Sequence, residues 1–190
     1  MRAAALPGLV RPFTLLAPAV GVAGGACVAL AVTQNAWRGM TLFTAFASAV
    51  LVTCASNAWN HAFDVEIDRR NKPRRPIPSG LATSREALLL GHACALVGLL
   101  AGYLTTPWFF VCVTAGVLAT WIYSAPPLRT KRRTWGALLT IAIPRGALVP
   151  VAGWSVIAVP STPEPWALGA VAGLFVFGAA VTKDFADTEG

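Results

Sequence analysis

Six long apolar stretches dominate this chain and limit the folds that it can adopt. They comprise residues 13–33, 40–60, 87–105, 107–123, 135–159 and 165–182. A helix needs roughly 20 apolar residues to cross the hydrocarbon core of a bilayer, and each stretch is close to that length. Only 12% of the residues are charged and 56% are hydrophobic, which excludes an ordinary soluble domain and a disordered chain. The sequence therefore predicts an all-α, polytopic transmembrane helix bundle with six spanning helices in a single domain.

The basic residues lie between these stretches and mark one side of the predicted membrane. All fifteen lysines and arginines except Arg38 and Arg145 fall in the N-terminal arm, in the second-to-third and fourth-to-fifth connections, or at the C-terminal end. Because basic residues accumulate in cytoplasmic loops, we expect the N-terminus and these loops to be cytoplasmic. The net charge of +7 therefore indicates contact with anionic membrane lipid and anionic substrates, and no nucleic-acid motif is present.

The longest polar stretch, residues 57–80, begins near the end of the second apolar stretch. Asn60, Asp64 and Asp68 are spaced four residues apart, so they share one face if the helix continues through them. Oxygen ligands at a membrane surface suit a hard divalent cation, and Mg²⁺ usually combines one or two carboxylates with substrate phosphate oxygens. A solvated helix end with charges one turn apart is the alternative, and the spacing alone leaves both interpretations open.

A basic, proline-rich loop follows and favours the metal site. Five basic residues lie within residues 69–75, among them Lys72, Arg74 and Arg75. A diphosphate needs both a metal ion and cationic side chains for its neutralisation. The alternative interpretation is that the basic residues only orient the protein in the membrane and contact lipid. It would explain the basic residues but not the neighbouring carboxylates. The loop ends at Thr83 and Glu86, whose spacing predicts a capping box at the start of the third spanning helix.

Two further polar stretches lie on the same predicted side. Residues 123–133 end the fourth apolar stretch with paired prolines and carry a second basic patch that includes Lys131. Residues 183–190 follow the sixth stretch, where Asp184 and Asp187 are one helical turn apart. Spans of equal parity end on the same side, so the two acidic helix ends can face each other and clamp metal ions on one diphosphate.

Arg145 lies near the middle of the fifth apolar stretch, where an arginine costs roughly 2.5–3.5 kcal/mol on insertion scales. Pro144 precedes it and predicts a kink that opens the backbone toward the bundle interior. We expect Arg145 to face a central cavity and to contact a carboxylate or an anionic group of an acceptor. Snorkelling is the competing interpretation, although the residue lies roughly 15 Å into the span.

These residues together resemble the UbiA-type intramembrane prenyltransferases. The first signature of that family, NxxxDxxxD followed by NKPxRPIxSG, is matched by Asn60, Asp64 and Asp68 and then by residues 71–80. The YSxPPxRxKR segment is matched by residues 123–132, and the KDxxDxEG beginning of the second acidic motif by residues 183–190. The signature sequences are most similar to those of the branch that contains chlorophyll synthase, homogentisate prenyltransferases and digeranylgeranylglyceryl phosphate synthase.

The resemblance implies Mg²⁺-dependent transfer of a polyprenyl group from a polyprenyl diphosphate to an aromatic quinone or pigment precursor, or to another lipophilic acceptor. It implies that the catalytic residues are Asp64, Asp68 and Asp187. Asn60 and Asp184 are further expected metal ligands. Alternatively, Asp184 could act as a base on the acceptor side. The expected substrate-binding residues are Asn60, Lys72, Arg74, Arg75, Tyr123, Lys131, Arg145 and Lys183.

Two features depart from the family pattern. Members have about nine spanning helices, whereas six stretches here reach spanning length, and the sequence stops before the aspartate that usually closes the second acidic motif. We therefore expect a domain that is incomplete at its C-terminus. His61 stands where many members have aspartate, and on a helix it points away from the acidic face, so we expect an indirect role beside the site or contact with the cytosol.

Two other functions stay open. A truncated family member could bind metal or prenyl diphosphate without turnover. A small-molecule transporter also carries intramembrane charges and Gly- or Pro-interrupted helices, but transport sites lie near the bilayer midplane, whereas these carboxylates lie at helix ends. The prenyltransferase interpretation predicts an integral protein of a bacterial or archaeal cytoplasmic membrane.

Overall fold

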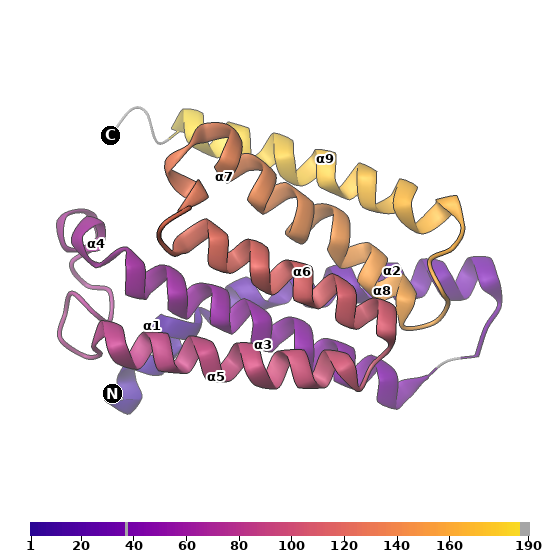
Figure 1. The fold of residues 1–190 in the computed structure, drawn as a ribbon, viewed down its shortest axis with the longest axis horizontal. Coiled ribbons are helices and arrows are strands. Elements are labelled where there is room, and N and C mark those ends of the chain that lie inside the picture. Colours follow the sequence, from indigo (N-terminus) through magenta and orange to yellow (C-terminus); the bar gives the residue numbers. More distant parts are fainter. Residues whose placement is uncertain (37, 187–190) are drawn as a thin grey trace.

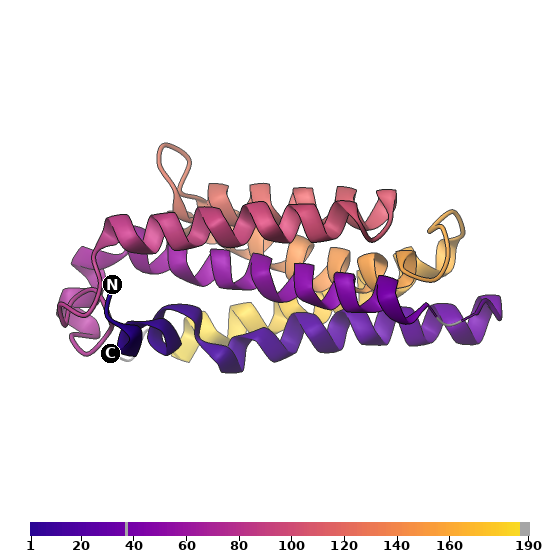
Figure 2. The same cartoon turned by 90° about the horizontal axis from the view of Figure 1, so that it is seen from below.

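The computed structural model describes residues 1–36 and 38–186, with side chains described as far as Thr182. The regular structure of this part is entirely helical, and its long helices run along a common direction (Figure 1, Figure 2). Six of its segments are long and apolar enough to cross a membrane: Pro12–Thr33, Gly39–Phe63, Ser84–Tyr103, Pro107–Ser124, Thr134–Ser155 and Pro163–Thr182. They coincide with the six predicted stretches to within about one helical turn. The predicted all-α transmembrane bundle is therefore confirmed.

The helices follow one another with few interruptions. Their order is η1 (Ala3–Ala5), α1 (Leu6–Val10), η2 (Pro12–Leu15), α2 (Leu16–Thr33), α3 (Gly39–Phe63), α4 (Val65–Asn71), α5 (Ser84–Tyr103), α6 (Pro107–Ser124), η3 (Thr130–Arg132), α7 (Thr134–Ile141), η4 (Ala142–Leu148), α8 (Val149–Ser155) and α9 (Pro163–Ala186). The fifth spanning segment is composite, because η4 is a π-helix inserted between α7 and α8.

Local sequence signals fix where the spanning helices begin. The Thr83 hydroxyl accepts a hydrogen bond from the Glu86 backbone N–H (3.2 Å), and the Glu86 carboxylate accepts one from the Thr83 N–H (2.8 Å). The predicted capping box at the start of α5 is therefore confirmed. Helix α6 begins in a similar way, with Pro107 in its first turn and the Thr106 hydroxyl accepting from the Phe109 N–H (3.1 Å).

Close backbone approach holds the spans together. Helix α2 packs on α8 so tightly that a Cβ at Gly25 would overlap the carbonyl of Pro150, and a Cβ at Gly153 would overlap the carbonyl of Val22. Small residues allow this approach, which matters in a bilayer because lipid tails are as apolar as the helix surfaces and packing must supply the attraction. The surrounding core includes the fully buried Trp154.

The polar segments gather at one end of the bundle. The N-terminal arm, α4, the turn that contains η3 and the C-terminal end of α9 all lie at the left of Figure 1. The connections between α2 and α3, α5 and α6, and α8 and α9 lie at the other end. The segments that carry the predicted acidic and basic motifs therefore share one end of the molecule.

Candidate active site

The first acidic motif spans a break between two helices. Helix α3 ends at Phe63 and α4 begins at Val65, with Asp64 between them at φ −105° and ψ 16°. The Arg129 guanidinium donates to the Phe63 carbonyl oxygen (2.7 Å), which an uninterrupted helix would use for its own ladder. The expectation of one continuous helix through Asp68 is therefore wrong, and a side chain from the α6–α7 connection accounts for the break.

Asn60 and Asp64 converge on one cation. The Lys131 ammonium lies 2.6 Å from the Asp64 carboxylate and donates to the Asn60 side-chain carbonyl at 3.0 Å. Arg129 donates to the same Asp64 oxygen at 2.9 Å. Burial lowers the pKa of Lys131 below its ordinary value, and the hydrogen bond to Asp64 acts in the opposite direction. The end of α3 and the connection after α6 thus form one charged centre.

Asp68 is buried and has a different partner. One Arg75 nitrogen lies 2.6 and 2.7 Å from the two carboxylate oxygens. The buried His61 ring approaches the same carboxylate, with Nδ1 3.7 Å from an oxygen. His61 therefore lies buried beside the site and does not point toward the cytosol.

A basic pocket adjoins this carboxylate at the end of the bundle. It is lined by Lys72, Arg74 and Arg75 of the proline-rich loop, together with Arg11 and His61. The Lys72 and Arg74 side chains are exposed there, whereas Arg75 is partly buried against Asp68. The loop predicted to neutralise a diphosphate therefore presents free cationic side chains beside the first acidic motif.

A cavity of about 180 Å³, here called the polar cavity, leads from Asn60 into the bundle. Its wall includes Arg11, Tyr123 and Arg145, which come from the N-terminal arm, α6 and η4. The Lys131 ammonium lies 5.9 Å from the centre of the Tyr123 ring. The charged centre is therefore continuous with a polar interior space.

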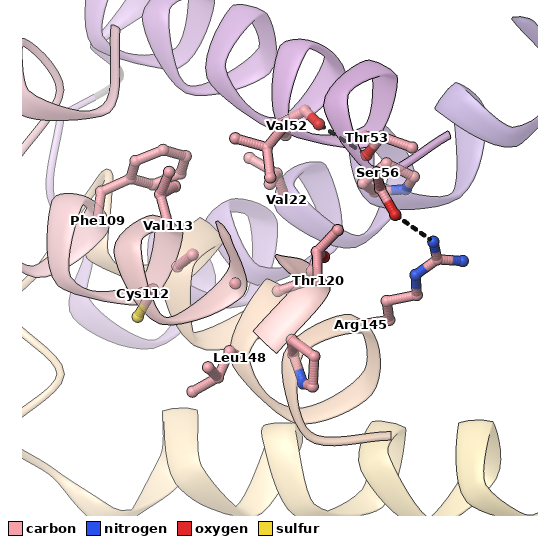
Figure 3. A pocket seen from close by; sticks show the side chains of 16 residues that line it. Val22, Val52, Thr53, Ser56, Phe109, Cys112, Val113, Thr120, Arg145 and Leu148 are labelled. Carbon is pink, nitrogen blue, oxygen red and sulfur yellow. Dashed lines mark hydrogen bonds between the residues drawn. The ribbon is translucent and has the colours of Figure 1, made fainter. Parts of the chain in front are cut away.

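A second cavity of about 90 Å³, here called the apolar cavity, adjoins the polar one, and Figure 3 shows the side chains that line it. Val22, Val52, Phe109 and Leu148 are among its apolar lining residues. Three residues line both cavities at their junction: Ser56, Thr120 and Arg145. A molecule with a polar head and an apolar tail could occupy both spaces.

Arg145 stands at this junction. Its guanidinium donates to the Ser56 hydroxyl at 3.1 Å, as the dashed line in Figure 3 marks. The side chain keeps accessible surface although it lies in the middle of a span, because it projects into the cavities. The residue therefore faces interior space as expected, and among the described residues no carboxylate forms an ion pair with it.

Comparison with known proteins shows to which family the chain belongs. Residues 13–190 match the UbiA prenyltransferase family. The chain belongs to that family. This UbiA chain is 33% identical over 135 residues to the bacteriochlorophyll synthase 33 kDa chain of Cereibacter sphaeroides, covering 69% of this chain and 43% of the relative. It is 41% identical over 99 residues to the digeranylgeranylglyceryl phosphate synthase of Ignicoccus hospitalis, covering 52% and 31%.

A third relative matches over more of the sequence. The UbiA chain is 30% identical over 191 residues to the chloroplastic homogentisate solanesyltransferase of Arabidopsis thaliana, covering 95% of this chain and 50% of the relative. The chain thus spans about half or less of the length of these curated relatives. The predicted resemblance to the family and to these relatives is confirmed.

Solved structures share the fold. A structure of digeranylgeranylglyceryl phosphate synthase superimposes with a TM-score of 0.83 at 22% identity, covering 98% of the UbiA chain and 63% of that protein. A UbiA homologue from Archaeoglobus fulgidus bound to DMAPP and Mg²⁺ gives a TM-score of 0.73 at 22% identity, covering 90% and 61%. The helical arrangement is therefore that of known UbiA membrane proteins.

The structure brings some of the predicted site residues together and separates others. Asn60, Asp64 and Lys131 are in mutual contact, and Asp68 contacts Arg75. The remaining residues lie apart from this centre: Tyr123 and Arg145 line the polar cavity, and Lys72 and Arg74 line the basic pocket. Asp187 lies outside the described residues, and the side chains of Lys183 and Asp184 lie outside the described part of the chain as well.

Two arginines at the site were not among the predicted site residues. Arg129 has a left-handed backbone (φ 39°) and ties the α6–α7 connection to Asp64, and its place two residues before Lys131 in the basic segment was the available signal. Arg11 also has a left-handed backbone (φ 54°) and lines both the basic pocket and the polar cavity. Nothing in the N-terminal sequence indicated that Arg11 turns into the bundle.

The oxygen donors of the charged centre suit Mg²⁺. Within residues 1–36 and 38–186, no three His, Cys, Asp or Glu side chains are grouped to hold a metal ion. The Asn60 and Asp64 oxygens nevertheless converge on one positive charge, the Lys131 ammonium. Amide and carboxylate oxygens of this kind are ligands for a hard divalent cation. Asn60 and Asp64 therefore fit a magnesium site, and Asp68, which is paired with Arg75, is a further carboxylate beside it.

Proposed function

We propose that this UbiA family member transfers a prenyl group from a polyprenyl diphosphate to a lipophilic acceptor within the membrane. The observation that carries the proposal is the convergence of Asn60, Asp64 and Lys131 at the mouth of the polar cavity, which continues into the apolar cavity. The charged end suits a diphosphate and the apolar end suits an isoprenoid tail. Polar recognition groups beside an apolar chamber are typical of sites for amphiphilic ligands.

The charged centre would bind the diphosphate. Asn60, Asp64 and Asp68 are the described candidates for holding Mg²⁺, with Asp184 and Asp187 as further candidates. When bound, the ion would supply charge neutralisation to the departing diphosphate. Lys131 and Arg75 are held by Asp64 and Asp68 in this structure, and we expect both to donate to phosphate oxygens when substrate binds.

The basic side chains around this centre would complete the neutralisation. Lys72 and Arg74 are exposed in the basic pocket and free to reach a bound diphosphate, and Lys183 is a further candidate at the end of α9. Cleavage of the allylic C–O bond leaves its electron pair on the diphosphate, so donors aimed at those oxygens favour ionisation.

The cavities would hold and protect the prenyl group. The tail would pass Ser56 and Thr120 into the apolar cavity, where water is excluded and cannot capture the allylic cation. The Tyr123 ring lies beside Lys131 and offers an aromatic face to that cation. The acceptor then forms a bond to the allylic carbon and releases a proton. An aromatic quinone or pigment precursor is the acceptor class that the bacteriochlorophyll and homogentisate relatives suggest.

The proposal is tested with the 190-residue chain in lipid nanodiscs. Binding of radiolabelled geranyl diphosphate is measured with and without Mg²⁺, followed by release of diphosphate and analysis of prenylated products from added membrane extract. We expect Mg²⁺-dependent binding that falls at least roughly tenfold in Asp64→Asn and Asp68→Asn, equivalent to about 1.4 kcal/mol or more. Glu66→Gln is the matched control, because Glu66 lies on α4 with its side chain 83% exposed.

Two results would refute the prenyl-transfer proposal. One is geranyl diphosphate binding that depends neither on Mg²⁺ nor on the two aspartates. The other is an equal loss of binding in Glu66→Gln, which would mean that any reduction of acidic charge at this end weakens the interaction. Binding without product would instead support the alternative of a family member that does not turn over.

A further inference from the structure

A groove of about 890 Å³ lies between α7 and α9, at the end of the bundle where the polar segments gather. The two helices pack side by side there (Figure 1). The groove shares no lining residue with the polar cavity or the apolar cavity, so it is a separate space. We call it the α7–α9 groove, and its lining includes Arg133, Thr134, Trp135, Leu138, Phe177 and Val181.

The walls of the α7–α9 groove are apolar and aromatic. The Trp135 ring of α7 stacks on the Phe177 ring of α9, with their centroids 6.5 Å apart and their planes at 25°. Trp135 is the second residue of the fifth spanning segment and is 70% exposed. Tryptophan at the end of a spanning helix is typical of the headgroup level of a membrane. The groove therefore opens at the membrane surface and presents apolar side chains to the lipid below it.

The rim of the groove carries unpaired cations. Arg133 lines the groove itself, and Arg132 lines an adjoining pocket of about 250 Å³. Thr134 lines both spaces. Both arginines are exposed, and neither guanidinium group forms an ion pair or a hydrogen bond within the described part of the chain. Two cations and a hydroxyl are thus available to an anion at the mouth of an apolar groove.

The backbone that carries these arginines is held against α7. The hydroxyls of Thr130 and Thr140 lie 3.0 Å apart, and the Arg133 N–H donates to the Thr130 carbonyl oxygen at 3.0 Å. A Cβ at Gly136 would lie 2.9 Å from that same oxygen, so only glycine allows the η3 turn to pack this closely. The two arginines therefore extend from a fixed turn.

We propose that the α7–α9 groove binds an anionic glycerophospholipid. Its phosphodiester would lie at Thr134 between Arg132 and Arg133, and one acyl chain would follow Phe177 along the groove. Guanidinium groups bind phosphate oxygens through paired hydrogen bonds, and basic pockets between spanning helices recognise anionic headgroups. An apolar helix of a second copy would cover Arg133 without supplying a negative charge, so charge complementarity favours the lipid.

Bound lipid would act on the charged centre through the same turn. Arg129 and Lys131 contact Asp64, whereas Arg132 and Arg133 face the groove and its adjoining pocket. A lipid phosphate would reduce the repulsion within this run of four cations. The α6–α7 connection would thereby be stabilised from the membrane side in the position in which it reaches Asp64.

Photolabelling in nanodiscs tests the site with the 190-residue chain. The probe is phosphatidylglycerol with a diazirine on its acyl chain, present as a small fraction of phosphatidylcholine, and labelled peptides are mapped by mass spectrometry. We expect labels on α7 and α9 around Trp135 and Phe177. One basic residue near the membrane surface strengthens binding of anionic lipid about fivefold, so Arg133→Gln should lower this labelling by about that factor.

Three controls make the result specific. The same diazirine on phosphatidylcholine should label these peptides at least a few-fold less, because it carries no net charge. Arg85→Gln removes an exposed charge at the start of α5, at the same end of the bundle, and should change nothing. Thermal unfolding checks that each variant is folded, and Arg132→Gln should show a similar loss of labelling if Arg133→Gln does not fold.

Three outcomes would overturn the proposal. One is equal labelling by the two lipids, or unchanged labelling in the folded arginine variants. Another is displacement of the probe by excess sn-glycerol 3-phosphate, which would show that the arginines bind a free phosphate and that the apolar groove is not needed. The third is weak labelling by both lipids together with a dimer in native mass spectrometry, which would show that a second copy covers the groove.

Discussion

Loss of Arg75 should destabilise the fold far more than loss of either cation beside Asp64. Asp68 is 5% exposed in its side chain and Arg75 is its only ion-pair partner among the described lysines and arginines. Asp64, in contrast, contacts both Arg129 and Lys131. Arg75→Gln therefore leaves a buried carboxylate without a cation, whereas Arg129→Gln leaves Lys131 in place.

The magnitudes follow from burial. Breaking a buried ion pair by removing one partner costs about 3–5 kcal/mol, and Arg75, whose side chain is 18% exposed, should fall near the lower end. Arg129→Gln should cost about 1 kcal/mol, because Asp64 keeps a charged partner. The control Arg69→Gln breaks an exposed i,i+3 pair and should cost roughly 0.3 kcal/mol. Arg69 is 62% exposed and its partner is solvated as well.

Thermal unfolding in detergent, followed by far-UV circular dichroism, measures these differences. At roughly 2–4 °C per kcal/mol for a chain of this size, Arg75→Gln should lower Tm by roughly 6–12 °C and Arg69→Gln by roughly 1 °C. Adding Asp68→Asn to Arg75→Gln should restore most of the loss, because the buried charge is then gone. A Tm for Arg75→Gln as mild as that of Arg69→Gln, or no recovery in the double variant, would refute the reasoning.

Three further perturbations test the packing and the caps. Gly25→Ala should lower Tm clearly because its methyl group would meet the backbone of α8, whereas Gly24→Ala has open space and should not; equal effects would contradict the close approach. Thr83→Ala should cost about 1 kcal/mol by removing the cap of α5, measurable as a Tm shift, and an unchanged Tm would contradict that role. Asn57→Ala should lower Tm by removing the two hydrogen bonds that tie the N-terminal arm to α3, and an unaltered Tm would show that the arm holds its place without this side chain.

The spans were predictable because their cause is local. Length, apolar composition and the scarcity of charge identify a membrane helix without knowledge of its neighbours, and the six predicted stretches matched for that reason. The capping box between Thr83 and Glu86 was predictable in the same way. The break at Asp64 was not, because it depends on Arg129, whose side chain arrives from a connection 66 residues later to take the Phe63 carbonyl.

For Arg145, the sequence predicts one property of the side chain but not another. A charge in an apolar stretch predicts an inward-facing side chain, and that part needs no tertiary knowledge. Pro144 lacks an N–H and predicts a disturbed helix, but the disturbance could be a kink, a bulge or a short π-helix. A π-helix carries more residues per turn than an α-helix, so it changes which wall the following residues face. The direction of Arg145, toward Ser56 and the same cavity as Arg11, is therefore a property of the assembled bundle.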